Sequence, residues 1–291
     1  MEVIIAKKAG FCFGVRRAIQ MVEDALAGET PVYSLGPVIH NPQVIRKLKE
    51  SGLREEEDLE AIDEGIVIIR SHGVPLHIYR AIEEKGLTVF DTTCPFVKKM
   101  HRKARSLFQE GYQLIIVGDR HHPEITSLTD DPHFQALVVS RASELDGVSL
   151  SKKIGLISQT TQPTENFNEV AGRLLPEASE LKIFNTICDS TITRQLEARE
   201  IAAQVEAMII IGGRNSANTR RLAKICQESG TRTFWVETAS ELQPEMVDGL
   251  ESVGLTAGAS TPKWIINEVV TRLSVLTSNS THAGITLPVG R

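Results

Sequence analysis

The chain has 291 residues, of which 41% are hydrophobic and 24% are charged, and its formal net charge is −5. These values are typical of a globular protein with a substantial core. The acidic balance argues against a nucleic-acid-binding protein, which usually has a basic surface. No apolar run approaches the roughly 20 residues of a membrane helix, and the N-terminus lacks the order of a signal peptide. We therefore expect a cytoplasmic protein with reduced thiols that binds neither nucleic acid nor membrane.

Strand-like and helix-like patterns alternate along the chain. Helical patterns are expected at about 15–27, 95–110, 190–205, 215–228 and 262–275. Between them lie short, continuous apolar runs at 66–69, 114–117, 154–157 and 207–211. Such runs are typical of strands that are buried on both faces, as in a parallel sheet covered by helices. The sequence therefore predicts an α/β fold.

Three cysteines, Cys12, Cys94 and Cys188, each open a copy of a repeated unit. Each is followed 24 residues later by a glycine and 28 residues later by a polar residue, which is His40, His122 or Ser216. A second apolar run in each copy ends in a further polar cluster. Equivalent positions of a repeat can converge on one centre, so the pattern predicts three lobes with a shared site.

The repeat also predicts the domain boundaries. Lobe 1 is expected at 1–93 and contains the N-terminal strand and the first cysteine unit, lobe 2 at 94–187 and lobe 3 at 188–275. The remaining residues, 276–291, are polar, show no period and are expected to form a C-terminal tail. Because no low-complexity linker separates the lobes, we expect them to pack together.

The three repeated cysteines are candidate metal ligands. None belongs to a Cys-x-x-Cys pair, which argues against zinc-ribbon and thioredoxin sites. Each precedes a predicted helix, whose dipole favours the thiolate that binds metal. Three thiolates fit either a [4Fe–4S] cluster with one iron that lacks a protein ligand, or a zinc site with one open position. Cys226 has no counterpart in the repeat and is expected to be structural.

The polar clusters after the strands contain groups that bind anions. Glycine, helix N-termini, hydroxyls and imidazoles hold phosphate oxygens at the carboxyl ends of parallel strands. No phosphate-binding glycine loop of known pattern accompanies them. A histidine in such a loop is often only a loop residue, and an Asn-Ser-x-Asn-Thr segment is often only a helix cap, so both interpretations stay open. The candidates are His40, His72, His122, Ser216, Asn218 and Ser260.

Glu124 is a candidate proton donor. It lies two residues after His122, and a hydroxyl such as that of Thr160 could relay the proton. The alternative is a first-turn glutamate that stabilises a helix N-terminus. The remaining histidines considered have no counterpart in the repeat, which favours surface or packing roles; they are His77, His101, His133 and His282.

Motifs along almost the whole chain carry a family resemblance. They include Gly10-Phe11-Cys12-Phe13-Gly14-Val15, Gly36-Pro37-Val38-Ile39-His40-Asn41, Ser71-His72-Gly73-Val74, Asp91-Thr92-Thr93-Cys94-Pro95, His122-Pro123-Glu124, Gln159-Thr160-Thr161, Thr186-Ile187-Cys188, Asn215-Ser216-Ala217-Asn218-Thr219 and Thr256-Ala257-Gly258-Ala259-Ser260. In this order and spacing they resemble the LytB/IspH family, the 4-hydroxy-3-methylbut-2-enyl diphosphate reductases. The chain departs from the family's usual pattern at Ala217, where many members have a serine, in the segment 125–127, where a glycine is common, and at His121, which replaces a frequent asparagine.

The resemblance implies a cloverleaf of three α/β lobes around a central [4Fe–4S] cluster. It also implies a reductive dehydroxylation that consumes two electrons and two protons, releases water and yields isopentenyl and dimethylallyl diphosphate, the last step of the non-mevalonate isoprenoid pathway. A ferredoxin or flavodoxin would donate the electrons. The implied residues are Cys12, Cys94 and Cys188 for the cluster, His40, His72, His122, Ser216, Asn218 and Ser260 for the diphosphate, and Glu124, Thr160 and His122 for catalysis.

Two other functions stay open on the residues alone. A zinc-dependent hydrolase of a phosphorylated substrate would also use three thiolates and an open position. A non-enzymatic iron–sulfur carrier would need the thiolates but neither an open position nor Glu124. The metal content of the protein, zinc or iron with sulfide, distinguishes the zinc-dependent hydrolase from the reductase.

Overall fold

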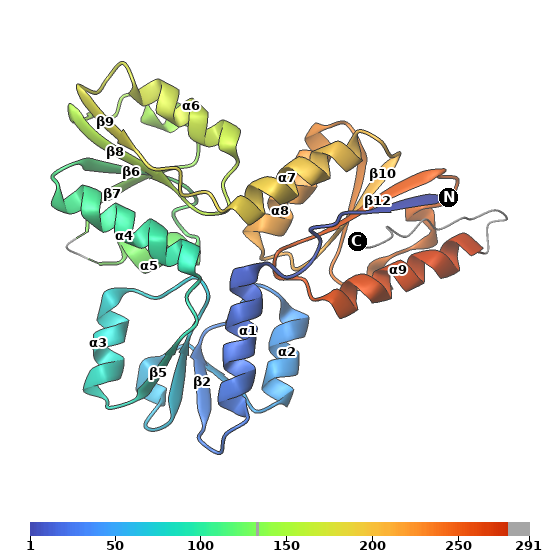
Figure 1. Ribbon diagram of the computed structural model, residues 1–291, viewed down its shortest axis with the longest axis horizontal. Coiled ribbons are helices and arrows are strands. Elements are labelled where there is room, and N and C mark those ends of the chain that lie inside the picture. The colour runs from blue at the N-terminus through green and yellow to red at the C-terminus, as the bar shows by residue number, and fades with distance from the viewer. Residues whose placement is uncertain (132–133, 279–291) are drawn as a thin grey trace. The chain divides into compact units, whose positions relative to one another are not determined.

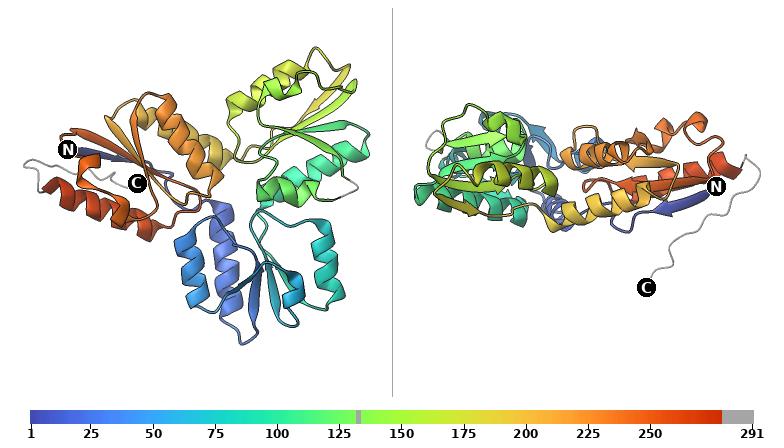
Figure 2. Two further views of the ribbon diagram at one scale, coloured as in Figure 1. Left: turned by 180° about the vertical axis from the view of Figure 1, so that it is seen from behind. Right: turned by 90° about the horizontal axis from the view of Figure 1, so that it is seen from above.

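The computed structural model describes residues 1–131 and 134–278. The strands in this part of the chain form three four-stranded sheets in which every pairing is parallel. Helices lie on both faces of each sheet, as Figures 1 and 2 show. The four predicted strands are all present, and each forms part of a sheet because its continuous apolar run is buried on both faces. The predicted α/β fold with three repeated lobes is confirmed.

The first sheet has the order β3-β2-β4-β5. Its core contains Val67 and Ile69 from the sheet and Val74 and Ile82 from the segment that follows it. The strands are β2 (Val32–Leu35), β3 (Arg54–Glu56), β4 (Ile66–Ile69) and β5 (Thr88–Asp91), and the helices in this part of the chain are α1 (Phe13–Leu26), α2 (Pro42–Glu50) and α3 (Leu76–Glu84).

The second sheet repeats this order as β7-β6-β8-β9. Met100 and Leu107 of its first helix pack against Leu114 and Ile116 of the sheet. The strands are β6 (Gln113–Val117), β7 (Ala136–Val139), β8 (Lys153–Ser158) and β9 (Glu180–Ile183), and the helices are α4 (Pro95–Gln109), α5 (Pro123–Thr129) and α6 (Thr164–Leu174).

The third sheet has the order β1-β12-β10-β11, so its fourth strand comes from the N-terminus of the chain. Two hydrophobic clusters cover its faces, one with Ile265 and Val269 and the other with Ala198 and Leu222. The strands are β1 (Glu2–Ile5), β10 (Ala207–Ile211), β11 (Arg232–Val236) and β12 (Ser252–Ala257), and the helices are α7 (Asp189–Ala202), α8 (Ala217–Glu228) and α9 (Lys263–Ser278).

The position of β1 corrects the prediction that the N-terminal strand belongs to lobe 1. β1 pairs in parallel with β12, from Glu2 opposite Ser252 to Ile5 opposite Leu255. In the described part of the third repeat no strand follows α9, so the edge of β12 is available to β1, and Val3 joins the core of this sheet. The other predicted lobe boundaries stay predictions.

Two further observations concern the limits of the fold. Helix α9 extends to Ser278, so the first three residues of the predicted tail, 276–278, belong to this helix. The predicted tail residues 279–291, together with His133 and His282, lie outside the described residues. No helix in the described part of the chain is long and apolar enough to cross a membrane.

The chain divides into two compact units. The first unit comprises residues 1–13, 40–44 and the segment that begins at Asp189, and it contains the sheet of β1 and β12. The second unit comprises 14–39 and 45–188 and contains the other two sheets. The candidate site residues therefore fall into two sets, one in each unit.

Candidate active site

The three repeated cysteines share one local environment. Each lies directly before a helix: Cys12 before α1, Cys94 at the N-cap of α4 and Cys188 before α7. None of the three forms a disulfide with another described residue, and all three are partly exposed. A thiol at a helix N-terminus has its thiolate stabilised by the helix dipole, which is the form that binds metal.

The backbone ties each cysteine to the polar cluster of the preceding repeat. The amide of Cys94 donates to the carbonyl of Ser71, beside His72, at 2.9 Å, and the amide of Cys188 donates to Thr160 at 2.9 Å. The amide of Cys12 donates to Ala259, beside Ser260, at 3.1 Å. The third repeat is thus hydrogen-bonded to the first, at the cysteine that follows β1. Each thiol lies next to groups predicted to bind or activate the substrate.

Gly14 is required by its close approach to one of the thiols. A Cβ atom at this position would lie 2.5 Å from Sγ of Cys94 and 3.3 Å from its Cβ. A side chain here would have to displace this thiol, so glycine allows α1 to pass close to Cys94 without moving it. The sequence contains this glycine directly after Cys12-Phe13.

Cys226 differs from the other cysteines. It is buried in α8, with its thiol 3.9 Å from the carbonyl of Ala198. Burial raises its pKa to about 12, so the thiol is protonated at neutral pH, which disfavours a role as nucleophile or metal ligand. The structure therefore supports its structural interpretation.

The donor set fits a metal centre by its chemistry. Cys12 belongs to the first unit, whereas Cys94 and Cys188 belong to the second. Among the described residues, no group of three His, Cys, Asp or Glu side chains is arranged to hold a metal ion. The three cysteines still have the right chemistry, because partly exposed thiols at helix N-termini are the ligands that iron–sulfur clusters and zinc prefer.

The first unit brings together His40, Ser216, Asn218 and Ser260. The hydroxyl of Ser260 donates to the carbonyl of His40 at 2.9 Å. Gly213 lies against the same carbonyl, because a Cβ there would be 2.9 Å from it. Ser216 caps α8 by accepting a hydrogen bond from the amide of Thr219 at 3.2 Å. These contacts place two hydroxyls and an imidazole near the N-terminus of α8, where anions are favoured.

Asn218 carries the strongest indication of a ligand in this unit. Its side chain is 5% exposed, and neither its Oδ1 nor its Nδ2 atom has a hydrogen-bond partner among the described residues. The hydroxyl of Thr219 next to it also has none in this part of the chain. Buried polar groups are nearly always hydrogen-bonded, so this pair indicates a place where a polar ligand completes the bonding.

The second unit brings together His72, His122, Glu124 and Thr160. The rings of His72 and His122 meet edge to face, with centroids 5.6 Å apart. The amide of Glu124 donates to Nδ1 of His122 at 3.1 Å, so His122 caps α5. The carboxylate of Glu124 accepts the amide of Thr160 at 2.7 Å through Oε1 and its hydroxyl at 2.9 Å through Oε2.

The carboxyl group of Glu124 is tuned for proton transfer. It is 2% exposed, and this burial raises its pKa to about 7, although the two hydrogen bonds from Thr160 oppose the shift. A group with this pKa holds a proton about half of the time at neutral pH and can release it readily. Glu124 therefore combines the first-turn position of a helix with the protonation behaviour of a general acid.

His101 and Ser127 extend this site and were not predicted as part of it. The hydroxyl of Ser127 lies 2.9 Å from the carbonyl of Glu124 and 3.1 Å from that of His72, and it can donate to either. Nε2 of His101 lies 3.2 Å from this hydroxyl and 3.3 Å from the carbonyl of Glu124. Burial lowers the pKa of His101 to about 4, so its ring is neutral at pH 7.

The packing role expected for His101 is thus only part of what the structure shows. The sequence did carry a signal, since the apolar face of α4 contains Val97, Met100 and Ala104, and position 101 lies on the same face. Ser127 stands in the segment where the chain departs from the pattern it resembles. Together the two side chains join the backbone of His72 to that of Glu124.

The features of both units define a parallel α/β protein with free thiols and anion-binding groups at the ends of its strands. This chain belongs to the LytB protein family, which matches residues 3–274. A 4-hydroxy-3-methylbut-2-enyl diphosphate reductase of Pelobacter propionicus is 48% identical over 273 residues, which cover 94% of this chain and 98% of the relative. The enzyme of the same name from Geotalea uraniireducens is 45% identical, with 97% and 100% covered.

Two solved structures are also similar to this chain. One is an (E)-4-hydroxy-3-methyl-but-2-enyl diphosphate reductase described as the terminal enzyme of the non-mevalonate pathway. It is 43% identical with a TM-score of 0.70, and the match covers 94% of this chain and 99% of that one. The other is the E-1-hydroxy-2-methyl-but-2-enyl-4-diphosphate reductase from Plasmodium falciparum, with 25% identity, a TM-score of 0.90 and coverage of 98% and 90%.

Proposed function

We propose that this chain is a 4-hydroxy-3-methylbut-2-enyl diphosphate reductase. The reaction removes the allylic hydroxyl of the substrate as water, consumes two electrons and two protons, and yields isopentenyl and dimethylallyl diphosphate. The observation that carries this proposal is the identity of 45–48% to reductases of this name over nearly the full length of both chains.

Cys12, Cys94 and Cys188 would hold a [4Fe–4S] cluster. The support is their chemistry: they are three thiols outside any disulfide among the described residues, each lies directly before a helix, and each is tied by its backbone to a polar cluster. When bound, such a cluster would pass on, one at a time, the two electrons that an external donor provides, and would supply Lewis acidity toward the allylic hydroxyl. A ferredoxin or flavodoxin would deliver the electrons to the protein.

The diphosphate of the substrate would bind His40, His72, His122, Ser216, Asn218 and Ser260. This assignment is supported in the first unit by the N-terminus of α8 and by the amide of Asn218, which has no partner among the described residues. The paired rings of His72 and His122 support it in the second. Binding energy gained at the diphosphate, far from the reacting bond, would hold the hydroxyl in a reactive position.

Glu124 would protonate the departing hydroxyl. Hydroxide leaves poorly, and protonation by a positioned acid contributes about 10²–10⁴-fold to such reactions. The hydroxyl of Thr160 lies 2.9 Å from Oε2 of Glu124 and can pass the proton on, because a hydroxyl both donates and accepts. In this arrangement Thr160 also orients the carboxyl group through its backbone amide.

The test begins with the metal content of protein purified without oxygen. About four iron and four sulfide per chain are expected, and incubation of the protein with substrate and an excess of a chemical reductant should give the two C5 diphosphates. Replacing Cys12, Cys94 or Cys188 singly by serine should lower the iron content, whereas Cys226→Ala should not. About one zinc without sulfide would reject the reductase in favour of a hydrolase.

A further inference from the structure

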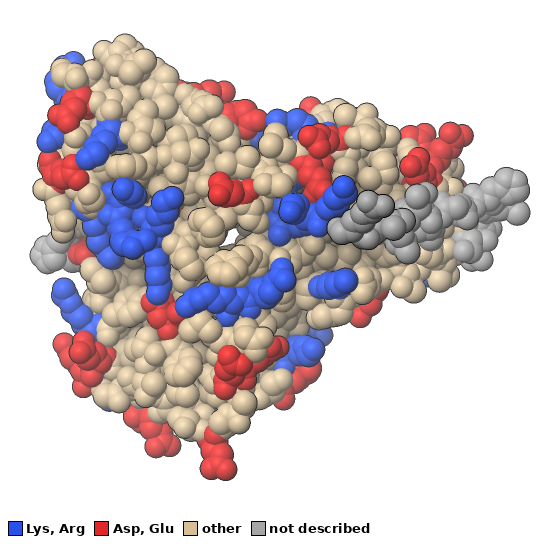
Figure 3. All heavy atoms as spheres, viewed as in Figure 1, with Lys and Arg blue, Asp and Glu red and all other residues tan. Residues whose placement is uncertain are grey.

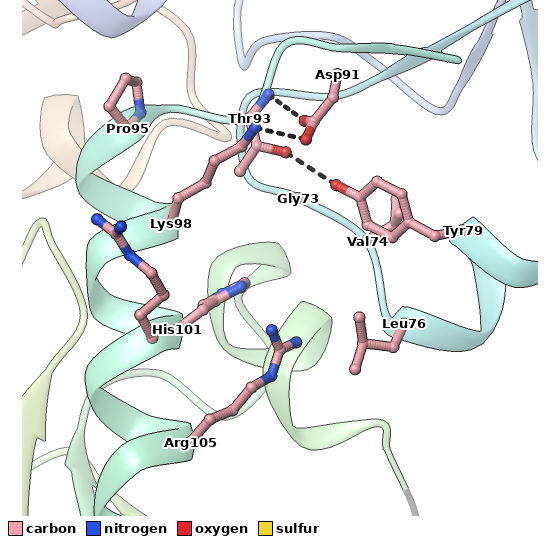
Figure 4. A pocket seen from close by; sticks show the side chains of 11 residues that line it. Gly73, Val74, Leu76, Tyr79, Asp91, Thr93, Pro95, Lys98, His101 and Arg105 are labelled. Atoms are coloured by element: carbon pink, nitrogen blue, oxygen red, sulfur yellow. Dashed lines mark hydrogen bonds and ion pairs between the residues drawn. The ribbon is translucent and has the colours of Figure 1, made fainter. Parts of the chain in front are cut away.

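A cavity of about 420 Å³ lies in the second unit, outside the set of residues proposed to bind the substrate. It is bounded by α3 and the loop before it, by the end of β5 and by α4, as Figure 4 shows. The lining residues that matter here are Gly73, Leu76, Tyr79, Lys98, Arg102 and Arg105. The volume lies in the range of about 300–1,000 Å³ that is typical of small-molecule sites.

One wall of the cavity is cationic. Lys98, Arg102 and Arg105 lie one turn apart on the same face of α4, and Figure 4 shows Lys98 and Arg105 extending toward the α3 side. Figure 3 shows that Lys and Arg side chains gather over this helix, which has no acidic residue along its length. The cavity therefore lies beside a positively charged surface of α4.

The charges of this wall are only partly neutralised. Asp91 is the carboxylate among the lining residues, and it pairs with Lys98 at 2.6 Å and accepts the amide of Thr93 at 2.9 Å. Arg102 and Arg105 make no hydrogen bond or ion pair with any residue that the structure describes. Two guanidinium groups thus remain to bind an anion, and guanidinium is the group best suited to phosphate oxygens.

The opposite wall is apolar and aromatic. It consists of Val74, Leu76 and the ring of Tyr79, whose hydroxyl lies 3.4 Å from that of Thr93. Burial raises the pKa of Tyr79 to about 12, so this hydroxyl stays neutral and adds no charge that would repel an anion. A ligand that matches both walls carries an anionic head and a short hydrocarbon chain.

We propose that this cavity is a second binding site for a diphosphate ester of a short isoprenoid chain. The diphosphate would lie on Arg102 and Arg105, and the hydrocarbon on Leu76 and Tyr79. The choice of this ester among organic phosphates rests on the proposed function, whose products are diphosphates of five-carbon chains. The site is distinct from the proposed substrate site because none of the residues proposed to bind the substrate lines the cavity.

The cavity is joined to the active site through three of its lining residues. His101 lines the cavity and contacts the carbonyl of Glu124 and the hydroxyl of Ser127. Gly73 and Thr93 line it as well, and they are the direct neighbours of His72 and Cys94. A ligand that occupies the cavity therefore contacts the residues that position the catalytic acid, so we expect its binding to change the turnover rate.

The test is equilibrium binding of geranyl diphosphate to anaerobically purified holoprotein. We expect two equivalents per chain, one in the active site and one in the cavity. The variant Arg102→Ala/Arg105→Ala should bind one equivalent at least about tenfold more weakly, because two charge-assisted contacts are lost. The matched control Arg46→Ala/Lys99→Ala removes two exposed cations outside the cavity and should bind as the wild type does.

A second variant tests the apolar wall. Leu76→Glu places a carboxylate opposite the arginines at the first position of α3, where an acidic side chain favours the helix. It should weaken the same equivalent at least about tenfold. Two further binding measurements test which parts of the ligand are needed. Inorganic diphosphate should bind this site more weakly than geranyl diphosphate, and geraniol should not bind.

Two results would overturn the inference. The first is binding by both variants with the stoichiometry and affinity of the wild type, and the second is equal binding of inorganic diphosphate. Turnover of 4-hydroxy-3-methylbut-2-enyl diphosphate by the same preparation tests the proposed function separately, because the wild type can be active without any second equivalent bound.

Discussion

The polar clusters of the two units differ in how completely their buried groups are bonded. In the second unit both oxygens of Glu124 accept hydrogen bonds from Thr160, and its backbone carbonyl is bonded as well. In the first unit the side chain of Asn218 is buried without a partner among the described residues. The acid is thus held by the protein itself, whereas the amide needs a ligand to complete its bonding.

This difference separates two roles that one active site must combine. A buried polar atom without a partner costs about 1–3 kcal/mol, and a ligand that supplies the missing partner recovers this free energy as affinity. A general acid must instead be oriented before the substrate arrives. The bonding of Asn218 therefore favours the proposed binding role of the first unit, and that of Glu124 favours the proposed proton transfer in the second. Each of the following predictions tests one of these two proposals.

The largest effect is expected for Glu124→Gln. The amide keeps the shape of the side chain but cannot donate an acidic proton, so kcat should fall by about 10²–10⁴-fold while KM changes little. Iron content and thermal unfolding show whether the protein is intact. The control Glu169→Gln changes an exposed carboxyl on α6 and should leave kcat unchanged. An active Glu124→Gln enzyme would remove Glu124 from the mechanism.

The raised pKa of Glu124 also predicts how stability depends on pH. Its pKa rises from 4.5 to about 7 on folding, so the folded state binds the proton more tightly, and this contribution is lost as the pH rises through 7. It amounts to at most roughly 3 kcal/mol. His101, whose pKa falls from 6.5 to about 4, acts in the opposite direction and destabilises the fold as the pH falls below 6.5.

Glu124 and His101 change the free energy of unfolding in opposite directions with pH, so their contributions must be separated by comparing variants. The free energy of unfolding of the wild type minus that of Glu124→Gln should decrease between pH 4.5 and pH 7. The same difference for His101→Gln should increase between pH 4 and pH 6.5. Urea unfolding at a series of pH values measures both. A difference for Glu124→Gln that is constant over this range would mean that the carboxyl group is ionised normally.

The prediction for the first unit concerns Asn218→Ala. Removal of the amide should raise KM by about 10–100-fold, the equivalent of one hydrogen bond to a charged group, with kcat little changed. The amide is bonded to water in the unfolded state but is buried without a described partner in the folded state, so its removal should not lower the free energy of unfolding. The exposed Asn215 of the same segment gives the control Asn215→Ala. A large loss of stability with an unchanged KM would show that Asn218 is a structural residue.

Local patterns in the sequence were enough to predict four interior strands, β4, β6, β8 and β10, and the surroundings of the thiols. A continuous apolar run such as Ile66–Ile69 can only be buried on both faces, and a cysteine before an amphipathic helix must lie at its N-terminus. The resemblance to the family identified the same residues, and the match over residues 3–274 confirms the family.

Long-range pairing could not be predicted in this way. β1 joins β12 across almost the whole chain, and nothing within residues 2–5 specifies which open edge they pair with. Ser127 and His101 are 26 residues apart, and their contact depends on how α5 lies against α4. The unbonded state of Asn218 is also a property of its neighbours rather than of its own segment.

The smallest effect is expected for Ser127, whose hydroxyl lies between the backbone carbonyls of His72 and Glu124. Ser127→Ala removes a hydroxyl that lies within hydrogen-bonding distance of the carbonyls of His72 and Glu124 and of the ring of His101. We expect a loss of about 1 kcal/mol in the free energy of unfolding. Because Glu124 keeps both bonds to Thr160, kcat should fall only a few-fold, with the pH of half-maximal activity displaced.

Two further variants separate positioning by Ser127 from simple packing. Ser127→Thr keeps the hydroxyl and should restore the pH profile, whereas Ser143→Ala, on an exposed residue of the same unit, should change neither stability nor activity. If Ser127→Ala lowers stability but leaves the pH profile of kcat unaltered, the hydroxyl serves the fold alone. In that case the orientation of Glu124 depends on its two hydrogen bonds from Thr160, and Ser127 has no part in positioning the acid.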